Sequence, residues 1–417
     1  MSTPSLAELT RVSARIGILS FGGPAAQIAL MHKELVEDRD WLDEQSFLRA
    51  LSLCMLLPGP EAMQLATYAG WRLHGVIGGL IAGLLFVLPG AAIILALALG
   101  YAAYGQLPLV QGVFVGIKAT VIVIVLQALL KVSRKALTSR AAWVIAGLAF
   151  LGIFAFSLPF PLIIAAAAFW GYFSTKSQSV AAQPEQQSVL KNLLTIVIWG
   201  SLWLVPLALL AVFDQTFLTQ IGLFFAKLAV VTFGGAYAVL AYMTQTVVAD
   251  FGWISTSEMI DALGLAETTP GPLILVTEFV ALLAGFNQGG TGLALAAGAV
   301  ALWATFMPCF LWIFLAGPYL DQIAARPRLS AALQSITAAV VGVILNLSVW
   351  FALHVLFETV HPAKFGPFSM PVPDIATFQP IAAGLMAFAA VLLLRLRWGL
   401  GRVLAIMGML AGAISFV

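Results

Sequence analysis

RIGILSFGGPAAQIALMHKELVEDRDWLDEQSFLRALSLCMLLPGP, residues 15–60, returns as KLAVVTFGGAYAVLAYMTQTVVADFGWISTSEMIDALGLAETTPGP in residues 227–272. Fifteen of the 46 aligned positions are identical, without a gap, at an offset of 212 residues. Shared apolar composition does not align Gly, Pro and Trp landmarks in register, so the chain contains an internal repeat. The aligned landmarks are Phe21-Gly22-Gly23 with Phe233-Gly234-Gly235, Trp41 with Trp253, and Pro58-Gly59-Pro60 with Pro270-Gly271-Pro272.

The composition outside these landmarks is that of a membrane protein. Of 417 residues, 61% are hydrophobic and 9% charged, and the mean hydropathy is +1.02. Soluble chains carry about a quarter charged residues. The net charge of +2 lacks the basic excess that nucleic-acid binding requires, so no nucleic-acid partner is expected.

Thirteen apolar segments of the length that crosses a bilayer predict an all-α polytopic membrane protein. The fifth and sixth are short and share Pro159-Phe160-Pro161, which predicts a tight helical hairpin, and a Pro-rich stretch at 358–375 predicts a loop. The segments are about 10–31, 50–70, 75–101, 107–130, 141–158, 159–173, 193–213, 219–245, 259–285, 289–316, 331–357, 376–394 and 399–417.

The repeat organises these segments as six, one extra and six. Segment one matches segment eight, and seven crossings separate them, so the two halves are predicted to have opposite orientations in the membrane, an arrangement used by many secondary transporters. The expected organisation is a first repeat at 1–173, a polar linker at 174–192, an extra connecting segment at 193–213, and an inverted second repeat at 214–417.

Positive charge predicts the orientation. If every segment crosses, 13 Lys and Arg lie on the N-terminal side and four on the other, which predicts a cytoplasmic N-terminus and an external C-terminus. Three of those four lie in the loop 32–49, which changes sides if segment one or two is re-entrant. The first group is Arg11, Arg72, Lys131, Arg134, Lys135, Arg140, Lys176, Lys191, Arg326, Arg328, Arg395, Arg397 and Arg402, and the second is Lys33, Arg39, Arg49 and Lys364.

Helix-breaking residues interrupt four apolar segments. We call Gly22-Gly23 and Gly234-Gly235 the Gly-Gly breaks, and Pro58-Gly59-Pro60 and Pro270-Gly271-Pro272 the Pro-Gly-Pro breaks. Irregular backbone at membrane depth is tolerated only where it is buried in protein or lines a wet cavity. A half-helix that begins after a break points N–H groups and a positive dipole end at the gap, which suits an anion. The alternative is that the breaks only shape the bundle.

Three cations inside the segments are candidate anion contacts. Arg15 aligns with Lys227, each six residues before its Phe-Gly-Gly motif. Intramembrane charge usually marks a transport pathway. The alternative for both is that they extend to opposite membrane interfaces. Lys118 has no basic counterpart in the second half and is a secondary candidate.

Carboxylates near the breaks are candidates for coupling or gating. Glu61 directly follows the first Pro-Gly-Pro break, and Gln64, one helical turn later, faces the same way as a candidate substrate contact. Glu267 and Glu278 flank the second Pro-Gly-Pro break. Desolvated carboxylates can exchange protons near neutral pH. As an alternative, Glu61 is a structural ion-pair partner of Arg15 or Lys118.

The remaining reactive residues do not form an enzyme site. Cys54 and Cys309 are isolated in apolar stretches, and the four His are scattered, so neither a metal site nor a metal cofactor is expected. The sequence has no phosphate-binding glycine loop followed by Lys and Ser or Thr, so ATP hydrolysis is not expected. No enzymatic activity and no cofactor are predicted.

The landmarks in combination resemble the chromate ion transporter family in its long two-domain form. The resemblance covers nearly the whole chain and rests on Phe21-Gly22-Gly23-Pro24, Trp41-Leu42, Pro58-Gly59-Pro60-Glu61 with Gln64, and their second-half copies. It implies a protein of the bacterial inner membrane that expels chromate, with sulfate as the related oxyanion. The second half departs from the first at Ala236, opposite Pro24, and at Leu273, opposite Glu61.

Energetics favour export over uptake. One elementary charge moved through the membrane potential is worth about 2.3 kcal/mol per 100 mV, so a dianion leaving a negative interior gains roughly twice that. The prediction is a secondary transporter that exports chromate, driven by the membrane potential or a proton gradient, and confers chromate resistance. A sulfate importer, an anion channel and a membrane-embedded chromate reductase are the alternatives. The expected partners are the small anion and the lipid bilayer, and a homodimer is left open.

Overall fold

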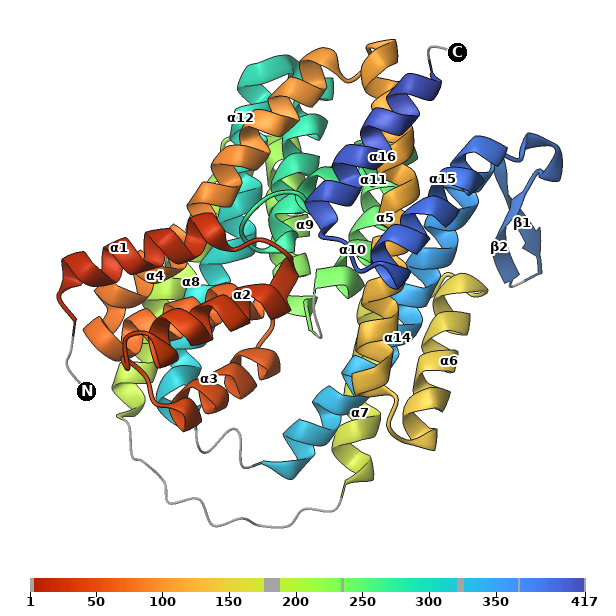
Figure 1. The fold of residues 1–417 in the computed structure, drawn as a ribbon. Helices are drawn as coiled ribbons and strands as arrows, with labels where there is room; N and C mark the ends of the chain where they lie inside the picture. The colour runs from red at the N-terminus through yellow and green to blue at the C-terminus, as the bar shows by residue number, and fades with distance from the viewer. Residues whose placement is uncertain (1–3, 176–187, 234–235, 321–325, 367, 416–417) are drawn as a thin grey trace. The chain divides into compact units, whose positions relative to one another are not determined.

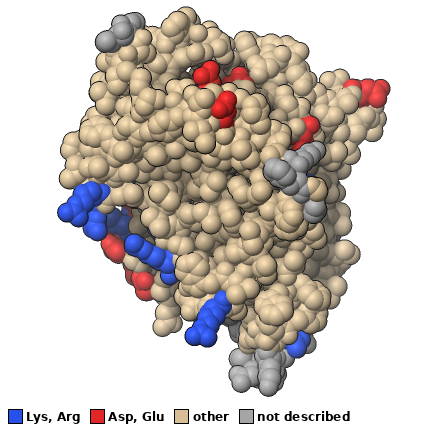
Figure 2. Space-filling model, turned by 90° about the vertical axis from the view of Figure 1, so that its right-hand side faces the viewer, with Lys and Arg blue, Asp and Glu red and all other residues tan. Residues whose placement is uncertain are grey.

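The computed structural model describes residues 4–175, 188–233, 236–320, 326–366 and 368–415, and these residues form an all-α protein with one small β-hairpin (Figure 1). Gly234 and Gly235 lie outside the described residues. Within these described ranges, five helices are long and apolar enough to cross a membrane, and shorter apolar helices accompany them. Most of the face seen in Figure 2 is uncharged, as a lipid-facing surface requires. The prediction of an all-α polytopic membrane protein is confirmed.

The chain order of the elements follows. The first half contains α1 (Leu6–Leu19), α2 (Gly23–His32), η1 (Lys33–Glu37), α3 (Glu44–Leu56), α4 (Glu61–Tyr104), α5 (Pro108–Ala136), α6 (Arg140–Phe154) and α7 (Phe160–Ser174), followed by α8 (Val189–Val212). The second half contains α9 (Thr216–Val231), α10 (Ala236–Thr244), η2 (Gln245–Asp250), α11 (Thr256–Ala266), η3 (Leu273–Leu275), α12 (Val276–Ala316), η4 (Gly317–Tyr319), α14 (Pro327–Leu356), β1 (Val360–Phe365), β2 (Phe368–Pro373), η5 (Ile375–Thr377), α15 (Pro380–Ala390), η6 (Val391–Arg395) and α16 (Leu400–Ile414).

Helices end at the breaks that the sequence marks. Between α1 and α2, Gly22 has a φ of 87° and Gly23 a φ of 76°; Gly59, between α3 and α4, has a φ of 117°; and Gly271, before η3, has a φ of 88°. These values lie in the left-handed region, which glycine adopts readily and other residues rarely do. The glycines therefore stop the helices, and the prolines beside them prevent the helical hydrogen-bond ladder from continuing.

The first broken segment is a hairpin. Arg15 Nε in α1 lies 3.3 Å from Glu34 Oε1 in η1, directly after α2. In one continuous helix, residues 19 positions apart would be separated by about 28 Å. The chain therefore reverses direction at Gly22-Gly23, as Figure 1 shows for α1 and α2. This corrects the expectation that segment 10–31 is a single crossing.

The second broken segment also folds back, and its end lies beside a residue that precedes α1. Pro4 O, just before α1, lies 2.7 Å from His74 Nε2 in α4. Beyond His74, α4 turns sharply at Gly75, which has a φ of 60°. A Cβ built at Gly70 would lie 2.2 Å from Gly78 O, so the two arms of α4 pack back to back. α3 and the first arm of α4 therefore form a second hairpin, and the second arm, 76–104, is long enough to cross.

The second half contains the same folded-back helix. Within α12, Gly289 and Gly290 leave the helical conformation, and Gly290 has a φ of 74°. A Cβ built at Gly285 would lie 2.7 Å from Leu293 O and from Ala294 Cα, so the arms of α12 also pack closely. The broken regions thus resemble each other in three dimensions as well as in sequence.

The chain divides into two compact units, and each takes segments from both halves of the sequence. The first contains Met1–Leu99, Lys176–Ala236 and Thr269–Ser330, and the second contains Gly100–Thr175, Tyr237–Thr268 and Ala331–Val417. In the second unit, α5 packs against α16 so closely that a Cβ at Gly116 would lie 2.0 Å from Met407 O. The stretch 358–375, expected as a loop, contains the antiparallel hairpin β1–β2.

Candidate functional site

The breaks of the two halves are joined by reciprocal backbone hydrogen bonds. Gly59 N donates to Thr232 O at 2.9 Å, and Gly271 N donates to Ser20 O at 2.9 Å. The offset of 212 that defines the repeat places Ser20 on Thr232 and Gly59 on Gly271. Each Pro-Gly-Pro break therefore donates to the residue just before the Gly-Gly break of the other half. All four residues belong to the first unit.

The side chains of the two acceptor residues repeat the same local contact. Ser20 Oγ donates to Ile16 O at 2.6 Å, and Thr232 Oγ1 donates to Leu228 O at 2.6 Å. Each hydroxyl thus satisfies a carbonyl in the last turn of its helix, where backbone acceptors lose their helical partners. Ser20 and Thr232 are 1% and 3% exposed. These buried polar ends therefore have partners within the protein.

The breaks lie at the level of the middle of the crossing arm of α4. A Cβ built at Gly90 would lie 2.2 Å from Pro270 O, and a Cβ built at Gly17, in α1, would lie 1.9 Å from Leu85 O. Gly90 is the midpoint of 76–104, about 21 Å from either end at 1.5 Å per residue. On the other side, a Cβ at Gly59 would lie 3.0 Å from Cys309 Sγ.

Helix N-termini open at this level. α2 begins at Gly23, α4 at Glu61, and η3 at Leu273, each directly after a break. The first N–H groups of a helix have no intrahelical acceptor, and the helix dipole adds partial positive charge there. The arrangement can therefore solvate a negative charge without a permanent cation at the same position.

Two glutamines hold the breaks in place. Gln27 Nε2 donates to Gly271 O at 2.6 Å and to Ser20 O at 3.3 Å, which ties the two halves together a second time. Gln64 Nε2 donates to Pro58 O at 2.7 Å and holds the first Pro-Gly-Pro turn. The Oε1 atoms of both are buried without a hydrogen-bond partner among the described residues. The sequence analysis did not select Gln27. It aligns with the apolar Val239 in the second half, and a polar residue at such a position could have been noticed.

Arg15 is held by a carboxylate that the sequence did not single out. Glu34 is only 4% exposed, and Arg15 Nε and Arg39 Nη1 lie 3.3 Å and 2.6 Å from its carboxylate oxygens. The Arg15 side chain itself is 60% exposed. Glu34 aligns with Thr246, so the repeat gives no signal for it. Lys227, the repeat partner of Arg15, is exposed on α9.

Lys118 also has its own carboxylate. Its Nζ lies 3.4 Å from Asp261 Oδ2 and donates to Ser257, and Tyr101 OH donates to the same Asp261 oxygen at 2.8 Å. These residues come from α4, α5 and α11 and lie in the second unit. The partners of Arg15 and Lys118 are therefore Glu34 and Asp261, so neither cation depends on Glu61 for neutralisation.

The predicted coupling carboxylates lie in three different settings. Glu61 is half-buried at the first turn of α4. Glu267 accepts a hydrogen bond from Tyr237 OH at 2.5 Å. Glu278, on α12, is 3% exposed, and its Oε2 has no hydrogen-bond partner among the described residues. Glu278 is therefore the carboxylate with the strongest physical reason to take up a proton.

A charged cluster lies at the turn after the first hairpin. His32 Nε2 lies 2.6 Å from Glu44 Oε2, and its Nδ1 lies 3.0 Å from Glu37 Oε1. The hydrogen bond to Glu44 is the main cause of a raised pKa of His32. The imidazolium form therefore stabilises the α2–α3 turn.

Discontinuous helices joined within a bundle of apolar helices are typical of membrane transport proteins. Comparison with known proteins agrees. The chromate transporter family model matches residues 7–172 and 219–416, two segments that begin 212 residues apart. The chain belongs to the chromate transporter family.

Individual relatives carry consistent names. The chain is 34% identical over 346 residues to the probable chromate transport protein of Synechococcus elongatus, covering 82% of this chain and 83% of that protein. It is 30% identical over 354 residues to the chromate transport protein of Cupriavidus metallidurans, covering 82% and 81%. These relatives are transport proteins and not enzymes. No solved structure matches the chain.

Replacing Gln27 with Leu tests the tie between the breaks. Gln27→Leu leaves the buried Gly271 carbonyl without its amide donor, which costs about 1–3 kcal/mol. We expect a lower unfolding temperature in detergent and reduced transport. Gln111→Leu, which removes an exposed contact with Gln106, is the control and should change stability by less than about 0.5 kcal/mol. Equal effects of the two substitutions would contradict the tie.

The His32 cluster predicts a pH-dependent stability. Because the folded pKa is raised, His32 stabilises the protein below its unfolded pKa, near 6.5, and loses that contribution as pH rises through the folded value. His32→Gln should therefore lower the unfolding temperature more at pH 5.5 than at pH 8.5, by less than about 1 kcal/mol because the pair is partly solvated. In a Glu44→Gln background the pH difference should largely disappear, and its persistence would rule out this pair as the cause.

Proposed function

We propose that this protein is a secondary transporter that exports chromate across the bacterial inner membrane and so confers chromate resistance. Membership of the chromate transporter family supports chromate as the substrate. The main support for the binding site is the pair of reciprocal hydrogen bonds between the breaks. This pairing brings helix N-termini close to the middle of the second arm of α4. A doubly charged tetrahedral anion is stabilised by N–H groups in such a position.

The two repeats are proposed to be inverted, with the divisions 1–173, 174–192, 193–213 and 214–417. Three segments between the first hairpin of one half and that of the other are long enough to cross the membrane: the second arm of α4, the whole of α5, and the whole of α8. The short pair α6–α7 returns to the side on which it starts and does not change the number of crossings. Three crossings are an odd number, so the second half begins on the opposite side. The reciprocal hydrogen bonds support the same pseudo-twofold relation.

The hairpins strengthen the charge argument for orientation. Because α1–α2 and α3–α4 both return to the side of Pro4, the loop 32–49 lies on the N-terminal side. Lys33, Arg39 and Arg49 then join the 13 basic residues already assigned there, and Lys364 remains alone among the loop cations on the other side. We therefore propose a cytoplasmic N-terminus and a periplasmic C-terminus.

Arg15 is proposed to exchange partners during transport. In the described structure it pairs with Glu34, which Arg39 also neutralises. An arriving dianion competes with Glu34 for Arg15, and Arg39 keeps the buried carboxylate paired meanwhile. Lys227 supplies the corresponding cation in the second half, and Lys118, held by Asp261, is a secondary contact. The break residues proposed to border the anion are Gly22, Gly23, Pro58, Gly59, Pro60, Gly234, Gly235, Pro270, Gly271 and Pro272, with Gln64 positioning the first Pro-Gly-Pro break. Proline has no N–H group, and the N–H groups of Gly59 and Gly271 already donate to the opposite half. The proposed donors are therefore the first N–H groups of the helices that follow the breaks.

Coupling is proposed to involve Glu61, Glu267 and Glu278. The Glu278 carboxylate is buried with one oxygen unpartnered among the described residues, and protonation relieves the cost of burying its charge. Export itself needs no proton, because a dianion leaving a negative interior gains about 4.6 kcal/mol at 100 mV. Proton exchange would then set the rate of turnover rather than its direction.

Opposite accessibility of the two Trp-bearing turns tests the inversion. In a Cys54→Ser, Cys309→Ser background, single cysteines at Asp40 and at Gly252 lie beside Trp41 and Trp253. In intact cells an impermeant maleimide should label the second turn and spare the first, and in everted vesicles the pattern should reverse. Labelling of both turns from one compartment would refute the inverted repeat.

Chromate flux into everted vesicles tests the site. Arg15→Ala and Gly23→Leu should each lower the initial rate at least tenfold while the protein remains folded, because one removes the cation and the other blocks the Gly-Gly break. Arg11→Ala, exposed on the same helix, is the control and should transport normally. Normal transport by both site variants would remove the proposed site. Steady conductance in planar bilayers would instead indicate a channel, and inward sulfate flux an importer.

A further inference from the structure

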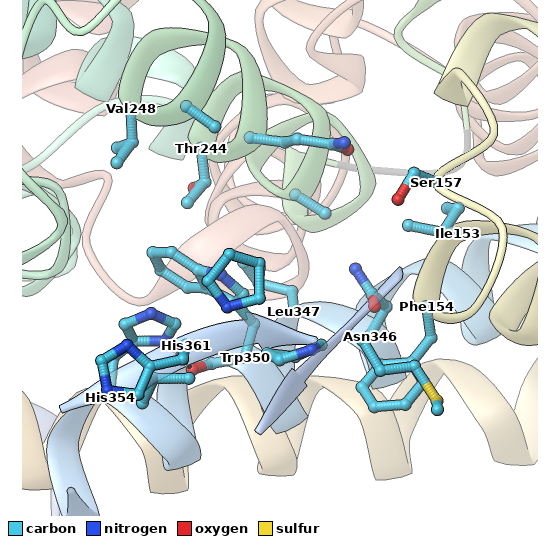
Figure 3. Close-up of a pocket in the computed structure, with 17 residues that line it drawn as sticks. Ile153, Phe154, Ser157, Thr244, Val248, Asn346, Leu347, Trp350, His354 and His361 are labelled. Carbon is cyan, nitrogen blue, oxygen red and sulfur yellow. Dashed lines mark hydrogen bonds between the residues drawn. The ribbon is translucent and has the colours of Figure 1, made fainter. Parts of the chain in front are cut away.

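A cavity of about 280 Å³ lies within the second compact unit, and none of the break residues is part of its lining. Its walls come from the end of α6, from α10 and η2, from α14, and from the β-hairpin. Figure 3 shows Thr244 and Val248 on one wall, with His354 and His361 on the opposite wall. The residues that carry polar groups into the lining are Ser157, Thr244, Gln245, Asn346, His354 and His361.

Thr244 gives an independent indication of a ligand. It is only 2% exposed, and its Oγ1 has no hydrogen-bond partner among the described residues. A buried hydroxyl without a partner costs roughly 1–3 kcal/mol, so such groups are usually satisfied by water or a ligand. Because Thr244 lines the cavity, that partner would have to lie inside it.

The other polar side chains around the cavity carry no permanent charge, and their hydroxyl and amide groups can both donate and accept. His354 Nδ1 lies 2.8 Å from Trp350 O, and a carbonyl only accepts, so this nitrogen carries the proton. Nε2 is then the ring nitrogen left for another partner, and in the neutral imidazole it accepts a hydrogen bond. Among the described residues that line the cavity, none is acidic.

The internal repeat relates this place to the charged turn of the first half. Thr244 and Gln245 align with His32 and Lys33, at the base of the corresponding hairpin. In the first half this turn carries paired charges, including His32 with Glu44. In the second half the aligned Thr244 and Gln245 are uncharged and line the cavity, and Asp250 of the same turn is not part of its lining. Under the proposed inversion the two turns lie at opposite membrane faces, so the cavity opens toward the outer side.

We propose that this cavity is a low-affinity site for a tetrahedral oxyanion at the outer face of the protein. The inference rests on the proposed function. Thr244, Gln245 and Asn346 supply hydroxyl and amide donors, and no carboxylate in the described lining repels an anion. The lack of a fixed cation keeps affinity low, which suits release.

A metal ion is the competing ligand, and the lining argues against it. Transition metals in proteins usually take three or four protein ligands from His, Cys and carboxylates. The described lining offers two imidazoles, and no group of three such residues occurs in the described part of the chain. The remaining polar groups are hydroxyls and amides, which suit oxyanions better than soft metals.

Two vesicle orientations test the proposal. The Thr244→Val, Asn346→Leu double variant should raise by at least fivefold the external chromate concentration that half-inhibits efflux from right-side-out vesicles. The half-saturating concentration at the inner face, measured in everted vesicles, should stay within twofold. Ser348→Ala, on α14 but outside the lining, should change neither value. Unchanged external inhibition, or an equal shift at both faces, would overturn the inference.

Equilibrium dialysis of the full-length protein against radiolabelled chromate separates this inference from the proposed function. The wild type should show a weaker site that the double variant lacks, even if no vesicle flux is detected. A wild type with flux but without that weaker site would contradict the cavity and leave the transporter standing. Binding of Zn²⁺ that is lost in His354→Gln, His361→Gln, with chromate binding unchanged, would assign the cavity to a metal instead.

Discussion

The structure depends on one constraint: backbone that leaves the helix inside a membrane protein must find its hydrogen bonds within the protein. Gly59 N and Gly271 N meet this requirement by donating to Thr232 O and Ser20 O, each in the other half of the sequence. Gln64 also bonds the Pro58 carbonyl within the first half, but these two glycine N–H groups both find their acceptor in the opposite half. The two repeats therefore have to assemble together before either break is stable, which couples the fold to the formation of the site.

The candidate cations with a described partner share a second feature: each forms an ion pair with a carboxylate. Arg15 pairs with Glu34 and Lys118 with Asp261. A buried unpaired charge is very costly, so these pairs stabilise the empty protein. They also make an anion compete for its cations. Such competition lowers affinity, and a transporter needs a site that releases its ligand as well as binds it.

Sequence comparison within the chain identified the breaks, because glycine and proline leave a local signature wherever a helix stops. It did not identify Glu34, which aligns with Thr246, or Gln27, which aligns with Val239. Neither residue recurs at the aligned position of the second half, and a repeat alignment selects what the halves share. Asp261 was missed for the same reason, since it aligns with Arg49. The reversal at Gly22-Gly23 was also missed, because a glycine pair predicts that a helix ends but not where the chain goes next.

The membrane class, the internal repeat, the positions of the breaks and the family could all be read from the amino-acid sequence. These follow from composition and local conformational preference, which act over a few residues. The folded protein was needed to show that the first two broken segments fold back as hairpins, that each Pro-Gly-Pro break bonds to the opposite half, and which carboxylate pairs with each cation. These outcomes depend on contacts between residues up to about 250 positions apart, such as Ser20 with Gly271, and local preference carries no information about them.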